Sequence, residues 1–214
     1  MMKLNAFQAC LFALSVAATL PSLAEAPLQG GASVGKQLAN EGAGSTAPCM
    51  SCRGSAGAGI AANDFPRIAG YSEYYLRKQL QDFHSGRRKH AVMQPMAYGL
   101  NDQQIADVAA YYAELPTPPF PDPPAVDAKI LAAGEALAER GDAARQLVAC
   151  ANCHGPLGIG LPPAIPSLAG QTREYISAQL KAWQRGDRSN DDGGLMAAVA
   201  NGLDDADIAA VAAY

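Results

Sequence analysis

Cysteine and histidine are scarce in this chain of 214 residues, which has five cysteines and three histidines. Apart from Cys10 near the start, every cysteine lies in one of two short motifs, at 49–52 and 150–153. No cysteine is left over for a disulfide that would link two domains. The remaining side chains also lack the complete four-ligand set of a structural zinc site, so a zinc protein is the least favoured class.

Other features are missing as well. No stretch alternates apolar and polar residues convincingly, so the sequence predicts almost no β-strand. The formal net charge is −4 at pH 7, and nothing indicates nucleic-acid binding. The apolar run at residues 6–20 is shorter than the roughly 20 residues that a membrane-spanning helix needs.

That run is typical of a secretory signal peptide. Lys3 precedes it, and small residues at Ala24-Glu25-Ala26 offer a cleavage site. We therefore expect residues 1–26 to be removed, and the mature chain to be periplasmic and soluble, without a transmembrane segment.

The stretch CANCH, from Cys150 to His154, carries the strongest chemical signal. Two cysteines separated by two residues and followed at once by histidine form the attachment motif of a c-type haem. The thiols of Cys150 and Cys153 bond to the porphyrin, and the imidazole of His154 binds the iron. A cysteine pair alone would equally suit a redox dithiol or a zinc half-site, so the adjacent histidine decides the interpretation.

A second stretch, CMSCR, repeats the pattern with Arg53 in place of histidine. A guanidinium has no lone pair for iron and stays protonated. Three outcomes remain open: a haem on Cys49 and Cys52 with a weak or vacant proximal position, a domain without haem, or a sequence change in a chain that normally has histidine here. We favour failed or impaired attachment. Because export favours disulfides, a Cys49–Cys52 disulfide is also open.

Two other histidines lie in the first half of the chain. His84 corresponds to Gln184 in the second half, which indicates a polar, water-facing position rather than an iron ligand. His90 ends the basic loop 87–90, which we expect to be solvated.

The chain contains an internal repeat of two similar units. The segment FPRIAG (65–70) corresponds to IPSLAG (165–170), and the segment that begins at Met93 corresponds to the one that begins at Met196. We predict a first domain at 27–115 and a second at 127–214, whose last helix would continue beyond Tyr214. The proline-rich linker at 116–126 favours a semi-rigid polyproline spacer.

Each unit reads as a small set of helices. A helix before each cysteine motif ends at Gly42 or Gly141, and the last helix of each unit is capped by Asn101 or Asp204. Apolar residues at helical spacing mark these helices: Val34, Leu38, Leu76, Leu80, Phe83, Ile105, Val108, Ala109 and Tyr112 in the first unit, and Ile130, Ala133, Ala136, Leu137, Ile176, Leu180 and Trp183 in the second.

The iron needs a second ligand opposite the histidine. Met196 follows the flexible Gly193-Gly194 pair and is the candidate for the second unit. Met93 is its equivalent in the first, with Met96 close enough to compete; core packing is the alternative for all three. A Met/His pair raises the reduction potential and leaves no open position, which favours electron transfer over catalysis.

Taken together, the twin cysteine motifs, the Pro-x-Leu/Ile-Ala-Gly loops, the methionine loops and the closing helices make the chain resemble the two-haem class I c-type cytochromes, and cytochrome c4 most closely. The resemblance implies an all-α fold of two tandem cytochrome c domains. It implies a periplasmic electron carrier, not an enzyme, that passes electrons toward a terminal oxidase or another redox partner. It makes Cys49, Cys52, Cys150 and Cys153 haem anchors, and Met93 and Met196 axial ligands alongside His154. Arg53 departs from this pattern.

Two other functions stay open. The chain is alternatively the haem c subunit of a larger dehydrogenase or oxidase complex, or a haem-based ligand sensor with an open site in the first domain. Residues 27–115 have a net charge of +1 and residues 116–214 a net charge of −5. A basic redox partner would therefore dock on the second domain, and the loop 87–90 would suit an acidic one.

Overall fold

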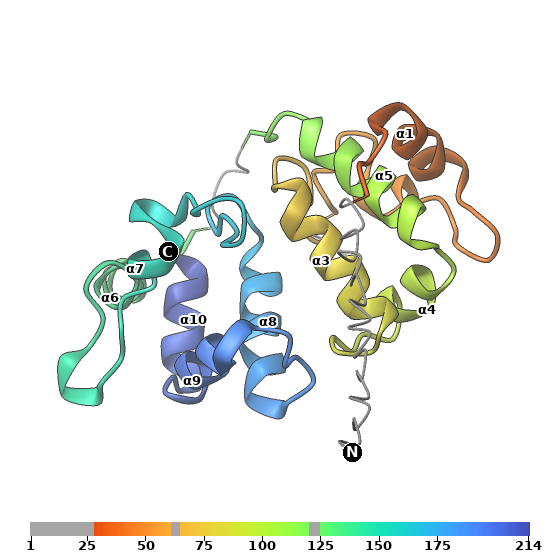
Figure 1. The fold of residues 1–214 in the computed structure, drawn as a ribbon. Helices are drawn as coiled ribbons and strands as arrows, with labels where there is room; N and C mark the ends of the chain where they lie inside the picture. Colours follow the sequence, from red (N-terminus) through yellow and green to blue (C-terminus); the bar gives the residue numbers. More distant parts are fainter. Residues whose placement is uncertain (1–27, 61–64, 120–124) are drawn as a thin grey trace, which may run out of the picture.

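The computed structural model describes residues 28–60, 65–119 and 125–214, and these residues form helices and loops (Figure 1). Within these ranges the backbone makes isolated β-bridges but no strand, which confirms the predicted all-α class. The expected signal peptide and residues 120–124 of the linker lie outside the described residues. Among the described helices, none combines the length and the apolar character needed to cross a bilayer.

The two repeats fold into domains that lie side by side (Figure 1). The first contains α1 (Ala32–Glu41), α2 (Met50–Arg53), α3 (Glu73–His84), α4 (Met93–Tyr98) and α5 (Asp102–Glu114). The second contains α6 (Ala128–Arg140), α7 (Ala151–His154), α8 (Arg173–Arg185), α9 (Leu195–Asn201) and α10 (Asp205–Ala213), with short 3₁₀ turns η2 (Ala143–Arg145), η3 (Pro156–Gly158) and η4 (Asp192–Gly194).

The first and last helices of each domain cross at close range through a glycine. A Cβ atom on Gly35 of α1 would lie 1.9 Å from the carbonyl oxygen of Asp107 in α5. A Cβ atom on Gly134 of α6 would lie 2.1 Å from the carbonyl oxygen of Ala210 in α10. Glycine is therefore required at both crossings, because any side chain would push the helices apart.

The apolar spacing of Val34 and Ile130 predicts these helices but not their buried faces. Both side chains are half-exposed, at 49% and 43%. The buried positions of α1 and α6 are instead the small residues, a glycine and an alanine in each. Small residues bury where backbones approach, so apolar bulk is a poor guide to the inner face here.

Predicted caps begin both closing helices. The Asn101 side chain accepts a hydrogen bond from the Gln104 N–H, and the Gln104 side chain accepts one from the Asn101 N–H. Asp204 and Asp207 exchange the same two bonds at α10. These reciprocal bonds satisfy free N–H groups at each helix start.

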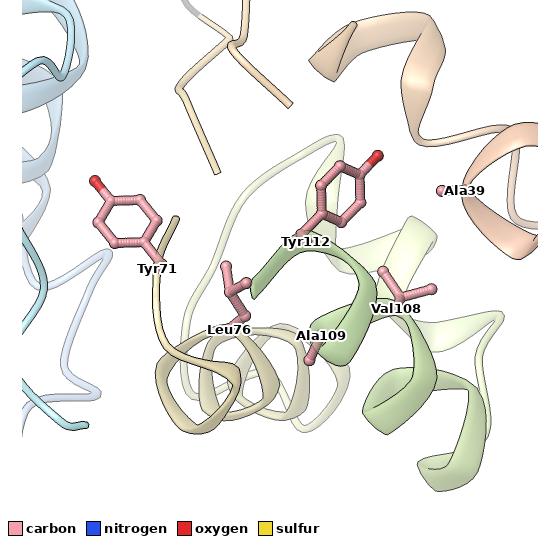
Figure 2. Close-up of a cluster of buried hydrophobic side chains, with 6 residues drawn as sticks. All are labelled: Ala39, Tyr71, Leu76, Val108, Ala109 and Tyr112. Atoms are coloured by element: carbon pink, nitrogen blue, oxygen red, sulfur yellow. The ribbon is translucent and has the colours of Figure 1, made fainter. Parts of the chain in front are cut away.

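The first domain has the larger core. Its buried cluster lies between α1, α3 and α5 (Figure 2) and consists of Ala39, Tyr71, Leu76, Val108, Ala109 and Tyr112. The corresponding cluster of the second domain has fewer and smaller members, Leu180, Ala200, Leu203 and Ile208. Helix α8 buries only Leu180, whereas its equivalent α3 buries four residues.

A polar network joins the two domains and repeats their symmetry. Arg88 donates to Oε1 of Gln79 at 2.8 Å and to Oε1 of Gln179 across the interface at 2.5 Å. Arg188 donates to the same two oxygens, at 2.9 Å to Gln179 and 3.3 Å to Gln79. Each glutamine therefore binds an arginine from both domains.

The expectation of a solvated basic loop at 87–90 is wrong for one residue. Arg88 is 5% exposed and lies between the domains, where it also donates to the hydroxyl of Tyr175 at 2.8 Å. The loop therefore offers an acidic partner fewer charges than the sequence indicates.

A buried carboxylate adds a second connection. Asp82 has no exposed surface and accepts hydrogen bonds from Asn190 of the other domain, at 2.7 Å, and from Lys78 and Arg87 of its own. Lys78 also donates to the carbonyl oxygen of Asn190 at 2.6 Å. Asp82 corresponds to Ala182 in the second repeat, so this connection has no symmetric copy.

Candidate functional site

His154 ends the short helix α7 and points inward, with 8% of its surface exposed. Its Nδ1 lies 2.8 Å from the carbonyl oxygen of Pro166, in the loop that follows the motif. A carbonyl oxygen only accepts, so Nδ1 carries the proton and Nε2 keeps its lone pair. Burial lowers the pKa of the imidazole, and the charge of Arg188 lowers it further, against the opposing effect of the Pro166 bond. The ring is held neutral and oriented, as a metal ligand must be.

The two thiols of the motif lie on the outer side of the same turn. Cys150 is half-buried and Cys153 is exposed, and both are free thiols, as are Cys49 and Cys52. Burial raises the pKa of Cys150. Cys150 therefore remains a neutral thiol at neutral pH, and both sulfurs are free for a covalent attachment.

Met196 lies in the first turn of α9 and packs against the buried cluster of the second domain. The loop before it is fixed by Asp191, whose carboxylate accepts from the indole Nε1 of Trp183 at 3.2 Å and from the N–H of Ala197 at 3.1 Å. Sequence reasoning missed Asp191. Its signal was an acidic residue five positions before the methionine, without a carboxylate at the equivalent place in the first repeat.

The second domain leaves large apolar side chains uncovered around these residues. Leu157, Ile159 and Leu161, which follow His154, are 50–68% exposed, and Leu195, beside Met196, is 68% exposed. The first domain has alanines, Ala56 and Ala58, in place of Leu157 and Ile159. Anchoring thiols, an oriented imidazole, a thioether and uncovered apolar surface fit a large flat apolar metal cofactor in the second domain.

The first domain brings different groups together. Arg53 is 9% exposed; its Nη2 lies 3.0 Å from the sulfur of Met93, and its Nη1 lies 3.4 Å from the carbonyl oxygen of Pro66. Burial lowers the pKa of the guanidinium, which keeps its charge because arginine does not lose its proton in proteins. The residues of this pocket do not fit an iron between position 53 and Met93.

Among the described residues, the other candidate ligands of the first domain make no hydrogen bond with Arg53. Of the two methionines, Met93 accepts a hydrogen bond from Arg53 through its sulfur, whereas Met96 accepts one from the hydroxyl of Thr46 through its backbone carbonyl oxygen, at 2.8 Å. His84 contacts the carbonyl oxygen of Ala97 at 3.0 Å and stacks on Tyr98. The Nδ1 of His90 accepts from the N–H groups of Val92 and Met93, and His90 is exposed.

Two helical domains, each with a cysteine pair on a short helix and a methionine in the first turn of a later helix, define a c-type cytochrome. The cytochrome c family matches residues 33–116 and 132–214, and the chain belongs to that family.

Its relatives carry electrons. The chain is 40% identical over 192 residues to the thiosulfate dehydrogenase electron acceptor of Stutzerimonas stutzeri, with 87% of each chain covered. Among solved structures, the thiosulfate dehydrogenase TsdBA of Marichromatium purpuratum matches with a TM-score of 0.79 and 42% identity over 86% of this chain and 39% of that one. Reduced cytochrome c4 of Pseudomonas stutzeri matches with a TM-score of 0.75 and 33% identity, over 86% and 97%.

These findings confirm the predicted fold and the predicted class of function. The protein is made of two tandem cytochrome c domains, it binds haem c, and it carries electrons to or from redox partners rather than acting as an enzyme.

Proposed function

We propose that this protein is a periplasmic electron acceptor of a dehydrogenase that oxidises thiosulfate or a similar sulfur compound, and that its second domain holds the electron. The similarity to thiosulfate dehydrogenase electron acceptors over most of both chains supports the donor. The apolar run at residues 6–20 supports export.

The observation that carries the second-domain site is the contact between His154 and Pro166. The carbonyl oxygen holds the proton on Nδ1, so Nε2 keeps the lone pair that an iron ligand needs. Cys150 and Cys153 would hold the haem through thioethers, and His154 and Met196 would supply nitrogen and sulfur ligands to its iron. The bound haem would supply one-electron chemistry. A thioether ligand from Met196 would raise the reduction potential, because it favours the softer ferrous ion, and would favour electron transfer over substrate binding.

The second domain is also the candidate docking surface for the donor. It carries most of the negative charge, and exposed carboxylates such as Asp192 and Asp205 contribute to it. A donor with a basic surface would approach this domain, and salt would slow the encounter.

Stopped-flow reduction by purified thiosulfate dehydrogenase and thiosulfate tests the proposal. We expect reduction whose rate rises with enzyme concentration and falls at high ionic strength. Ascorbate is the control, because it reduces the cytochrome without a docking step. Reduction by ascorbate but not by the enzyme would reject the assigned donor, and leave a carrier between other partners, such as one that passes electrons to a terminal oxidase as the resemblance to cytochrome c4 implies.

The sensor alternative needs an open iron position in the first domain. Direct contact between Arg53 and Met93 counts against it, since the sulfur accepts a hydrogen bond from a guanidinium, which has no lone pair for iron. Carbon monoxide added to the reduced protein is therefore expected to leave its spectrum unchanged.

A further inference from the structure

In the first domain, the residues equivalent to the candidate haem site of the second domain contact one another. Arg53 takes the place of His154, Pro66 that of Pro166, and Met93 that of Met196. In the second domain the imidazole contacts the proline carbonyl oxygen, and in the first the guanidinium contacts the equivalent oxygen. Arg53 is therefore held by the same backbone carbonyl oxygen that orients the histidine of the second domain.

The second terminal nitrogen of Arg53 contacts Met93, the residue equivalent to Met196. Metal–nitrogen and metal–sulfur bonds are about 2.0 and 2.3 Å long, so a nitrogen and a sulfur on opposite sides of one metal ion lie about 4.3 Å apart. The Nη2 of Arg53 and the sulfur of Met93 are 3.0 Å apart. No metal ion fits between them while this contact is made.

The surrounding core supports the same interpretation independently. At matching positions, helix α5 buries six residues between 105 and 110, whereas α10 buries three between 208 and 213. Beside the CMSCR motif the first domain has Ala56 and Ala58, where the second domain exposes leucine and isoleucine. The described first domain thus buries more of its own side chains, and exposes less apolar bulk beside its cysteine motif, than the second domain.

We propose that Arg53 replaces the iron as the link between the two walls of the first-domain pocket, so that this domain folds without haem and the protein carries a single haem in its second domain. This inference does not depend on which enzyme supplies the electron. A protein with a single haem cannot pass electrons between two haems, so electrons enter and leave through the second domain.

Matched cysteine variants test the haem count. Intact mass and pyridine haemochrome assays are expected to give one haem for the natural chain and one for Cys49→Ser/Cys52→Ser. The control Cys150→Ser/Cys153→Ser is expected to give none. Two haems in the natural chain, or loss of haem in the first variant, would overturn the proposal without touching the assigned donor.

A double-mutant cycle tests the link itself. Arg53→Met and Met93→Leu nearly conserve volume, so each removes the contact with little change in packing. Each is expected to raise the equilibrium constant for unfolding about tenfold, and the double variant no further than the worse single one, because the two residues act as a pair. Additive effects of the two substitutions would show that Arg53 and Met93 are not coupled and would contradict the proposal.

Discussion

At the level of single residues, the hydroxyl of Tyr112 is a polar group buried among apolar side chains. It is 2% exposed in the core of the first domain, and its hydroxyl has no hydrogen-bond partner among the described residues. Burial raises its pKa, so the hydroxyl stays neutral. A buried hydroxyl without a partner costs free energy, which a phenyl ring would avoid.

Tyr112→Phe is therefore expected to leave the free energy of unfolding unchanged or to raise it by up to about 1 kcal/mol. Tyr71→Phe is the matched control, since Tyr71 donates to the carbonyl oxygen of Ser167 at 3.0 Å and accepts from Gln171 at 3.1 Å. That variant is expected to lose about 1 kcal/mol. Urea denaturation followed by far-ultraviolet circular dichroism measures both. A clear loss in Tyr112→Phe would mean that the hydroxyl has a hydrogen-bond partner, which would contradict this account of Tyr112.

At the level of helices, the crossing of α6 and α10 depends on Gly134. In an exposed helix, alanine would be favoured over glycine by about 1 kcal/mol. At this crossing the added Cβ would meet the backbone of Ala210, which has no room to move without shifting the helix. The two effects have opposite signs, so the sign of the measured change decides between them.

Gly134→Ala is expected to lower the free energy of unfolding by at least ~2 kcal/mol. Ala133→Gly, at the adjacent exposed position, gives the scale of helix propensity alone and should cost about 1 kcal/mol. Thermal denaturation of the oxidised protein checks both. Stabilisation by Gly134→Ala would show that the helices do not approach as closely as described.

Much of the helical architecture follows from local sequence. The capping residues Asn101 and Asp204 and the apolar face at Ile105 and Tyr112 are readable because each acts within one or two turns. The inner faces of α1 and α6 could not be predicted in this way. The contacts there are made by Gly35 and Gly134, and the spacing of large apolar residues does not reveal them.

At the level of the whole molecule, the contacts that matter most were hidden from the sequence. Arg88 looked like part of a solvated basic loop because its glutamine partner across the interface, Gln179, lies 91 residues away. Likewise, no residue near Arg53 in the sequence indicates that its guanidinium contacts Met93, which lies 40 residues later. The repeat does place Gln79 with Gln179 and Arg88 with Arg188, and that symmetry was the available signal.

The domain interface should respond to acid through Asp82. Burial alone would raise the pKa of this carboxyl, but hydrogen bonds from Lys78, Asn190 and Arg87 outweigh it and hold the pKa below its ordinary value. The stabilisation is therefore complete above the ordinary value of about 3.9 and is lost as the pH falls through the lower folded value.

Asp82→Asn is expected to lower the free energy of unfolding by at least ~2 kcal/mol at pH 7, because it leaves buried donors without their carboxylate. The difference from the natural chain should stay constant above about pH 5 and shrink as the pH falls below about 4. Urea titrations across this range measure it, with the exposed Glu114→Gln as control. A difference that grows in acid would contradict the assigned role of Asp82.

The central claim is that the electron resides on a haem held between His154 and Met196. The most direct test is spectroelectrochemical titration of Met196→Leu beside Met93→Leu, the same substitution in the other repeat. The account predicts that Met196→Leu lowers the midpoint potential and abolishes the sulfur–iron charge-transfer band, because the thioether ligand is lost, while Met93→Leu leaves both unchanged. An unaltered spectrum in Met196→Leu, or an equal change in Met93→Leu, would contradict it.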